Sequence, residues 1–133
     1  MDLLYGADEF DITASALLLF FVPDAAKAVS EMVRVARPGD NVCADVWDLL
    51  GGGLSNAPIA KELWKGEIEI ALPPSLSVSS LGGLENLFRT GGLQDVDVRG
   101  IEARRTFEGF DDWWGATVGS MLAGIFSRIG PEH

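Results

Sequence analysis

Two short groups of residues in this chain have types and positions suited to lining a ligand site. Ala14, Ser15 and Ala16 follow one apolar run, and Trp47 with Asp48 ends another. In α/β sheets, ligands bind at the carboxyl ends of parallel strands. Small side chains leave room there, while a tryptophan beside an aspartate would give a pocket wall with one polar group. The alternative for the first group is a small-residue loop that only packs well.

Further tryptophans could add aromatic surface to such a pocket. Trp64, Trp113 and Trp114 are the candidates. Because tryptophan is large and apolar with one donor, filling the core or capping a helix is at least as good an interpretation. The substrate-binding prediction is therefore restricted to Trp47, Asp48 and Trp64.

Groups for acid–base, nucleophilic or metal chemistry are scarce. The single histidine, His133, is the last residue, so histidine-based catalysis inside the fold is not expected. Asp111 and Asp112 are adjacent acids at a predicted helix start, where carboxylates usually cap the helix. Cys43 lies within an apolar run and is predicted to be a small buried side chain. No metal motif is found, and catalytic residues stay unassigned.

The elements that would position these residues form one βαβ unit. A strand is predicted at Phe10–Ala14, buried on both faces because its residues do not alternate. Asp24 is a good N-cap for a helix that runs to Val35 with one apolar stripe. The turn Arg37–Asp40 then leads to a second strand, Asn41–Val46, parallel to the first.

The second half predicts further helices and one more strand. Helices are expected at Ile59–Lys65 and Leu81–Thr90, the latter with Gly91 as a left-handed cap. Alternating apolar and polar residues predict a strand at Asp95–Phe107. An amphipathic helix beginning at Asp111 or Asp112 is expected to run to Ile129.

Composition places the chain among soluble globular proteins. Its 133 residues suit a single domain, residues 1–133, and carry a net charge of −10. That charge repels phosphate backbones and anionic lipid, so neither nucleic acid nor a membrane is an expected partner. One cysteine excludes an internal disulfide, which favours a cytoplasmic location.

The segment from Phe10 to Asp48 closely resembles the middle of class I S-adenosylmethionine-dependent methyltransferases that act on small molecules. In that family, FD opens the fourth strand, PD starts the next helix, and E-M-x-R-V-x-R-P-G-G leads into the fifth strand. Here Phe10-Asp11, Pro23-Asp24 and Glu31–Gly39 stand at those places. A looser likeness continues through the rest of the chain to Trp114.

The resemblance implies an α/β fold, a partial Rossmann-like methyltransferase sheet of about three strands flanked by helices. It also implies methyl transfer from S-adenosylmethionine to a small-molecule acceptor, with Ala14, Ser15 and Ala16 beside the cofactor. Phe20 stands where the family often carries histidine, so we expect it to pack in the core. The family's glycine-rich cofactor loop cannot be placed, so we expect the C-terminal half of the domain, inactive as an isolated chain.

A different class of function is also consistent with these residues. A strand at Phe10–Ala14 without its neighbour would be an apolar edge, which tends to pair with another chain. The chain would then be a non-catalytic interaction protein derived from a methyltransferase, a homo-oligomer joined through that edge or through exposed helix faces. A third alternative is that a partner carrying the missing half completes the site.

Overall fold

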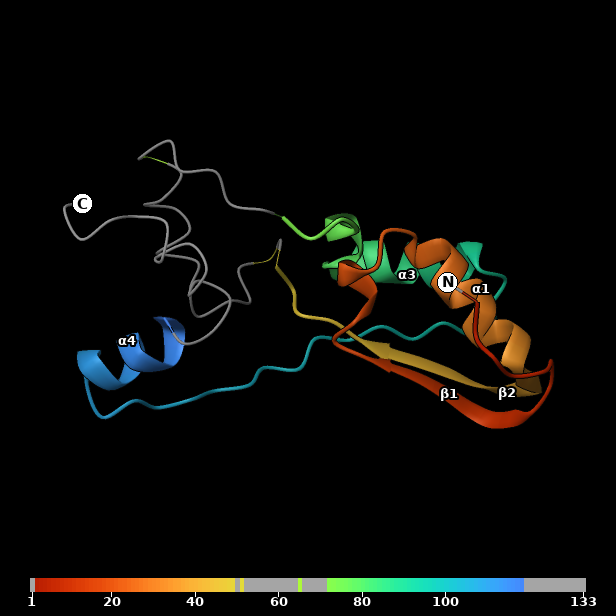
Figure 1. Ribbon diagram of the computed structural model, residues 1–133, viewed down its shortest axis with the longest axis horizontal. Coiled ribbons are helices and arrows are strands. Elements are labelled where there is room, and N and C mark those ends of the chain that lie inside the picture. Colours follow the sequence, from red (N-terminus) through yellow and green to blue (C-terminus); the bar gives the residue numbers. More distant parts are fainter. Residues whose placement is uncertain (1, 50, 52–64, 66–71, 119–133) are drawn as a thin grey trace. The chain divides into compact units, whose positions relative to one another are not determined.

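The computed structural model describes residues 2–49, 51, 65 and 72–118 (Figure 1). The chain divides into two compact units, and the first combines Met1–Leu54 with Leu72–Gly100. The second unit combines Ser55–Ala71 with Ile101–His133. The described part has a mixed α/β architecture, and its two strands form a parallel sheet.

The predicted βαβ unit is present in the first compact unit. Strand β1 spans Phe10–Ala16, helix α1 spans Ala25–Val35 and strand β2 spans Ala36–Asp45. The helix begins where the sequence predicts, because the Asp24 carboxylate accepts a hydrogen bond of 2.8 Å from the backbone N–H of Lys27. α1 packs on both strands and on helix α3, so it covers one face of the sheet.

Strand β2 begins earlier than predicted and includes a bulge. Phe10 pairs with Ala36, but Ile12 pairs with Asn41, so β2 accommodates extra residues between these two pairs. Gly39 lies in this bulge with φ of +88°, a conformation that glycine adopts without a steric penalty. The turn predicted at Arg37–Asp40 is therefore an interruption of the strand rather than a loop before it.

Helix α3 spans Leu81–Thr90 and matches its predicted bounds. Its N-cap is Ser80, whose hydroxyl accepts from the N–H of Gly83 at 3.1 Å. At the other end, Gly92 donates to Arg89 and Leu93 donates to Phe88, which is a Schellman motif.

The left-handed residue of that motif is Gly92, not the predicted Gly91. Gly92 has φ of +87°, whereas Gly91 has φ of −71° in the right-handed helical region. The prediction of a left-handed Gly91 was wrong because two adjacent glycines satisfy the same local pattern. Only the hydrogen-bond register decides between them.

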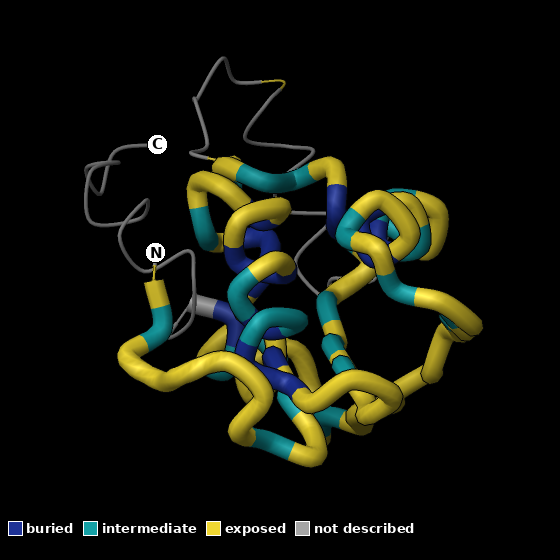
Figure 2. Tube along the Cα trace, turned by 90° about the vertical axis from the view of Figure 1, so that its right-hand side faces the viewer, coloured by how far each residue is buried: buried dark blue, intermediate teal, exposed yellow. Residues whose placement is uncertain are grey.

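The core of the first unit lies between the helices and the sheet. Along α1 and α3, buried residues recur every three or four positions and more exposed residues lie between them (Figure 2). The apolar residues buried in this cluster are Leu19, Phe20, Ala25, Ala28, Val29, Met32, Val78, Leu84, Leu87 and Phe88. Phe20, in the short 3-10 helix η1 at Leu19–Phe21, is only 1% exposed, which confirms its predicted role in packing.

A second 3-10 helix ties a distant segment to this core. η2 spans Leu76–Val78 and follows Pro73 and Pro74, which form neither helix nor strand, as predicted. The Ser75 N–H donates to the carbonyl of Phe20 at 3.1 Å, and the Ser75 hydroxyl donates to the carbonyl of Val22 at 2.7 Å. These two hydrogen bonds hold the loop after β1 against the segment that leads into η2.

The opposite face of the sheet is not covered by the described residues. Ile12 of β1 is 58% exposed, and Cys43, its near neighbour on β2, is exposed as well. The predictions that β1 is buried on both faces and that Cys43 is buried were therefore wrong. A strand without regular alternation of apolar and polar residues is compatible with burial of both faces, but burial of the second face requires another layer of structure to cover it.

The third strand predicted at Asp95–Phe107 is also wrong. Val96 and Val98 are partly buried against the core, and their neighbours Asp97 and Arg99 are exposed, as the alternation indicates. The segment nevertheless forms no strand. Alternation reports a half-buried extended chain, whereas a strand also needs a hydrogen-bonding neighbour.

The described part of the second unit contains helix α4, Phe110–Val118. It begins at Phe110, one residue before the predicted caps, and Asp111 and Asp112 lie in its first turn. The Asp112 carboxylate accepts from the N–H of Glu108 at 3.1 Å. A side chain in the first turn of α4 thus satisfies a backbone donor that precedes the helix. The remainder of the predicted last helix and the predicted helix at Ile59–Lys65, apart from Lys65, lie outside the described residues.

No described helix has the length and apolar character needed to cross a membrane.

Candidate functional site

The first unit contains a pocket of about 360 Å³ along the edge of β1 that faces away from β2. One wall is β1, and another is the flank of α1 with Ala28, Met32 and Val35. Leu3 and Tyr5, from the segment before β1, and Leu18, from the segment after it, contribute further apolar surface. The full lining is Leu3, Tyr5, Phe10, Ile12, Thr13, Ala14, Ser15, Ala16, Leu18, Leu19, Val22, Ala28, Met32 and Val35.

All three residues predicted to contact a cofactor line this pocket. Ala14, Ser15 and Ala16 are the last three residues of β1, and their small side chains leave the pocket open. Ser15 is only 8% exposed, and its hydroxyl has no hydrogen-bond partner among the described residues. A buried polar group without a partner costs free energy, so this hydroxyl would be stabilised by a hydrogen-bond acceptor that a rearrangement of the pocket brought to it.

The chain leaves β1 through a backbone conformation that the sequence does not indicate. Leu17 has φ of +51°, in the left-handed region where a side chain with a Cβ is disfavoured. Its N–H donates to the carbonyl of Asp45 at 3.0 Å, which fixes the strand end against β2. Strained residues of this kind often occur at binding sites. Leu17 itself does not line the pocket, but it connects the lining residues Ala16 and Leu18.

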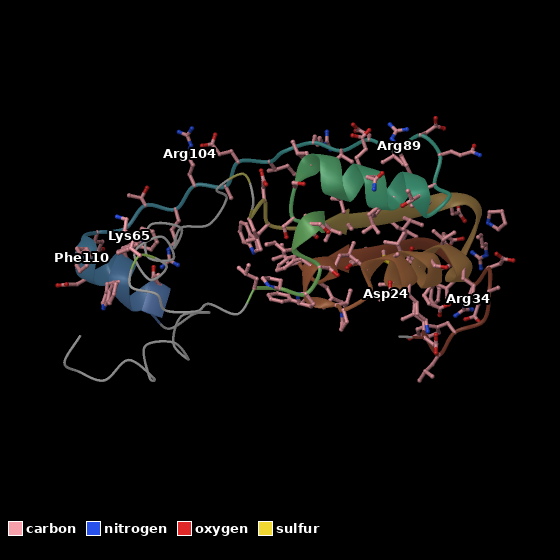
Figure 3. The ribbon with its side chains drawn as sticks, turned by 90° about the horizontal axis from the view of Figure 1, so that it is seen from above. Asp24, Arg34, Lys65, Arg89, Arg104 and Phe110 are labelled. Carbon is pink, nitrogen blue, oxygen red and sulfur yellow. The ribbon has the colours of Figure 1, made fainter. Side chains whose placement is uncertain are left out.

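An ionic cluster holds the segment before β1 against α1. The Arg34 guanidinium donates to both carboxylate oxygens of Glu31, at 2.7 and 2.8 Å. Arg34 also donates to the carbonyls of Leu3 and Tyr5, while Glu31 accepts from the N–H of Leu3 at 2.9 Å. Arg34 and Asp24 mark the two ends of α1 (Figure 3). Because Leu3 and Tyr5 line the pocket, this cluster sets the position of one pocket wall.

The same contacts determine the charge state of the cluster. Hydrogen bonds from Arg34 and from the backbone of Leu3 lower the pKa of Glu31 to about 2. The Glu31 carboxylate in turn raises the pKa of Arg34. The pair is therefore fully charged at neutral pH.

Two of the residues predicted to contact substrate, Trp47 and Asp48, are not part of the pocket lining. Trp47 and Asp48 follow β2, whose carboxyl end is beside that of β1 because Ala16 pairs with Asp45. Trp47 is 44% exposed, and the Asp48 carboxylate accepts from the N–H of Gly51 at 2.8 Å. Neither lines the pocket, and Trp64 lies outside the described residues. Their role in substrate binding stays a prediction.

Other candidate groups do not gather into a site within the described ranges. No cluster of three or more histidine, cysteine, aspartate or glutamate side chains there could hold a metal ion. On α4, Phe110 stacks on Trp114 with ring centres 5.8 Å apart, and Trp113 contacts both rings. His133 lies outside the described residues.

Comparisons with known proteins identify relatives but no described activity. The chain is 36% identical over 102 residues to the uncharacterized protein Rv1405c of Mycobacterium tuberculosis. It has the same identity to the uncharacterized protein Mb1440c of Mycobacterium bovis. The match covers 76% of this chain but 34% of each relative, so the chain spans about a third of their length. No protein-family model and no solved structure matches.

Proposed function

We propose that this chain is part of an S-adenosylmethionine-dependent methyltransferase that acts on a small molecule, and that the isolated chain is inactive. The single observation that carries the proposal is the pocket along the edge of β1. It is lined by Ala14, Ser15 and Ala16, the residues that the resemblance places beside the cofactor. The β1–α1–β2 order and the Asp24 cap also agree with the family pattern.

The residues present suit only part of the cofactor. S-adenosylmethionine, when bound, supplies the methyl group. The small side chains of β1 allow the cofactor to approach the strand backbone closely. The Ser15 hydroxyl is a polar group without a hydrogen-bond partner among the described residues. No described lining residue carries a carboxylate that could bind the ribose hydroxyls. We therefore expect the isolated chain to bind the cofactor weakly and to position no acceptor.

Nuclear magnetic resonance of the isotope-labelled chain with S-adenosylhomocysteine tests this proposal. At millimolar ligand we expect changes in chemical shift that are concentrated at Ala14–Leu17. Ala16→Phe, which fills the end of the pocket, should abolish them, and Ala26→Phe is the matched control. Ala26 is exposed on α1 and does not line the pocket. Absence of shifts, or shifts that Ala16→Phe leaves unchanged, would contradict the proposal.

Calorimetry then separates a partial site from a complete one. A dissociation constant near micromolar, about −8 kcal/mol, would mean that the chain or its oligomer completes the cofactor site. In that case the inactivity of the isolated chain would be the part of the proposal that fails, and methyl acceptors should be screened.

A second function is supported by a different observation. The outer edge of β1 has no neighbouring strand within the described part, and one face of the sheet is uncovered. A non-catalytic interaction protein derived from a methyltransferase would use such surfaces for assembly. This alternative predicts a stable oligomer with no response to S-adenosylhomocysteine.

A further inference from the structure

The segment Asp2–Tyr5, which we call the strap, is held against α1 by side chains of that helix. Figure 1 shows the chain running alongside α1 before it enters β1. Arg34 donates to the carbonyls of Leu3 and Tyr5 at 3.3 and 3.0 Å. The Glu31 carboxylate accepts from the N–H of Leu3 at 2.9 Å and from Arg34 itself. The strap is thus docked on one charged pair of the helix surface.

The strap crosses α1 directly beside the pocket. A third helix residue, Lys27, adds an ion pair of 2.9 Å with Asp2. The helix residues that hold the strap are spaced by four and three positions, so they form one polar stripe, which is Lys27, Glu31 and Arg34. The helix residues that line the pocket repeat this spacing one position later and are Ala28, Met32 and Val35. The two stripes therefore run side by side, about 100° apart around the helix.

The strap supplies part of the pocket wall but buries little apolar surface itself. Leu3 and Tyr5 both line the pocket, and the Tyr5 ring meets Phe10 edge-on with ring centres 5.0 Å apart. Leu4, however, is fully exposed, and Tyr5 is 54% exposed. Segments with few buried contacts and exposed hydrogen bonds open more readily than the rest of a fold. Docking of the strap therefore depends mainly on the polar stripe of α1.

The chain that follows the strap is fixed in a different way, by its backbone. The N–H groups of Asp8 and Glu9 donate to the carbonyls of Arg34 and Val35 at 3.1 and 2.9 Å. These bonds do not involve the polar stripe, so they persist when the strap leaves it. Gly6 lies between the strap and this anchored part, and glycine rotates about its backbone with the fewest steric limits. A movement of the strap is thereby confined to the residues before Asp8.

We infer that the strap is a hinged cover of the pocket, held closed by Glu31 and Arg34. While the strap is docked, Leu3 and Tyr5 close the side of the pocket next to the polar stripe. When it swings away about Gly6, this side opens and the apolar stripe of α1 becomes accessible. The docked contacts make the released state the minority form of the chain. The inference concerns access to the pocket and does not rest on the proposed function.

Fluorine nuclear magnetic resonance reports the position of the strap, because Tyr5 is the only tyrosine of the chain. In the chain labelled with 3-fluorotyrosine, contact with Phe10 should move the signal away from that of the free amino acid. Arg34→Gln removes the guanidinium that binds both strap carbonyls, and we expect the signal to move toward the free position. Arg89→Gln is the matched control, because it breaks an equivalent pair with Glu85 on α3. It should leave the signal in place.

Thiol alkylation tests whether the strap covers the pocket. In a Cys43→Ser background, Ala28→Cys places a thiol on the pocket wall at a position that is 4% exposed. Release of a strap that is open in a minority of molecules should speed its reaction with iodoacetamide at least about tenfold in Arg34→Gln. Loss of a nearby cation disfavours the reactive thiolate and would slow the reaction, so a faster reaction reports access. Arg89→Gln should leave the rate unchanged.

Glu31→Gln is a milder second variant, because its amide oxygen still accepts from the N–H of Leu3 while the charge pair with Arg34 is lost. We expect an alkylation rate between those of the parent chain and Arg34→Gln. Rates are compared below the thermal unfolding transition of every variant, so that each refers to a folded chain. An unchanged rate in both variants of the charge pair, or an equal rise in Arg89→Gln, would overturn the inference. A fluorine signal that moves without a faster alkylation would do so as well.

Discussion

The contact between α1 and α3 gives a prediction in which two opposing effects can be separated. Gly91 has an ordinary φ of −71°, so Gly91→Ala would gain about 0.4–1 kcal/mol by restricting the unfolded chain. The added Cβ would, however, lie 2.9 Å from Val29 Cγ1 and 3.3 Å from the carbonyl oxygens of Leu87 and Phe88. Val29 is fully buried and has no space to move, so overpacking should cost about 1–3 kcal/mol. We expect a net destabilisation of about 1 kcal/mol.

A double-mutant cycle identifies the cause of that destabilisation. Val29→Ala alone should cost about 2 kcal/mol through lost burial and the resulting cavity. Adding Gly91→Ala to it should then be neutral or stabilising, because the clashing methyl group is gone. The two changes would be coupled favourably by about 1–2 kcal/mol.

Gly92→Ala is the control, because it should destabilise through the backbone and not through contact. Gly92 has φ of +87°, and a Cβ there would meet no atom within 4 Å. Val29→Ala should therefore not rescue it. Urea denaturation of all variants, with unchanged m-values, gives the free energies of unfolding. Equal rescue of Gly91→Ala and Gly92→Ala would refute this account of the helix contact.

Three further predictions follow from single contacts. Asp24→Ala should lower the free energy of unfolding by about 1 kcal/mol and Asp24→Asn by less, because asparagine also caps; equal losses in urea denaturation would exclude capping. The pKa of Glu31 is lowered to about 2, so its stabilising effect is complete above about 4.5 and is lost as the pH falls toward 2. Acid titration of Glu31→Gln should lack this component, and an unchanged profile would contradict it. Ser15→Ala should raise the free energy of unfolding by about 1 kcal/mol in thermal unfolding, and a destabilised variant would show that the hydroxyl has a partner.

Helices α1 and α3 were predictable because their signals are local. A capping side chain, a 3.6-residue apolar stripe and a terminal glycine act within a few residues of one another. Asp24 and the buried residues Leu84, Leu87 and Phe88 occupy the places that the pattern indicates. The choice between Gly91 and Gly92 was not predictable, since it depends on a single hydrogen-bond register.

The sheet was less predictable because strand formation depends on distant residues. Thr13 pairs with Val42 as expected for a βαβ unit. Asp95–Phe107 has an equally regular pattern, but a pattern cannot supply the neighbour that would pair with it. Similarly, the apolar character of Ile12 does not reveal whether a second layer covers it. The location of Ala14–Ala16 at a pocket followed from strand order, whereas the left-handed Leu17 has no signature in its residue type.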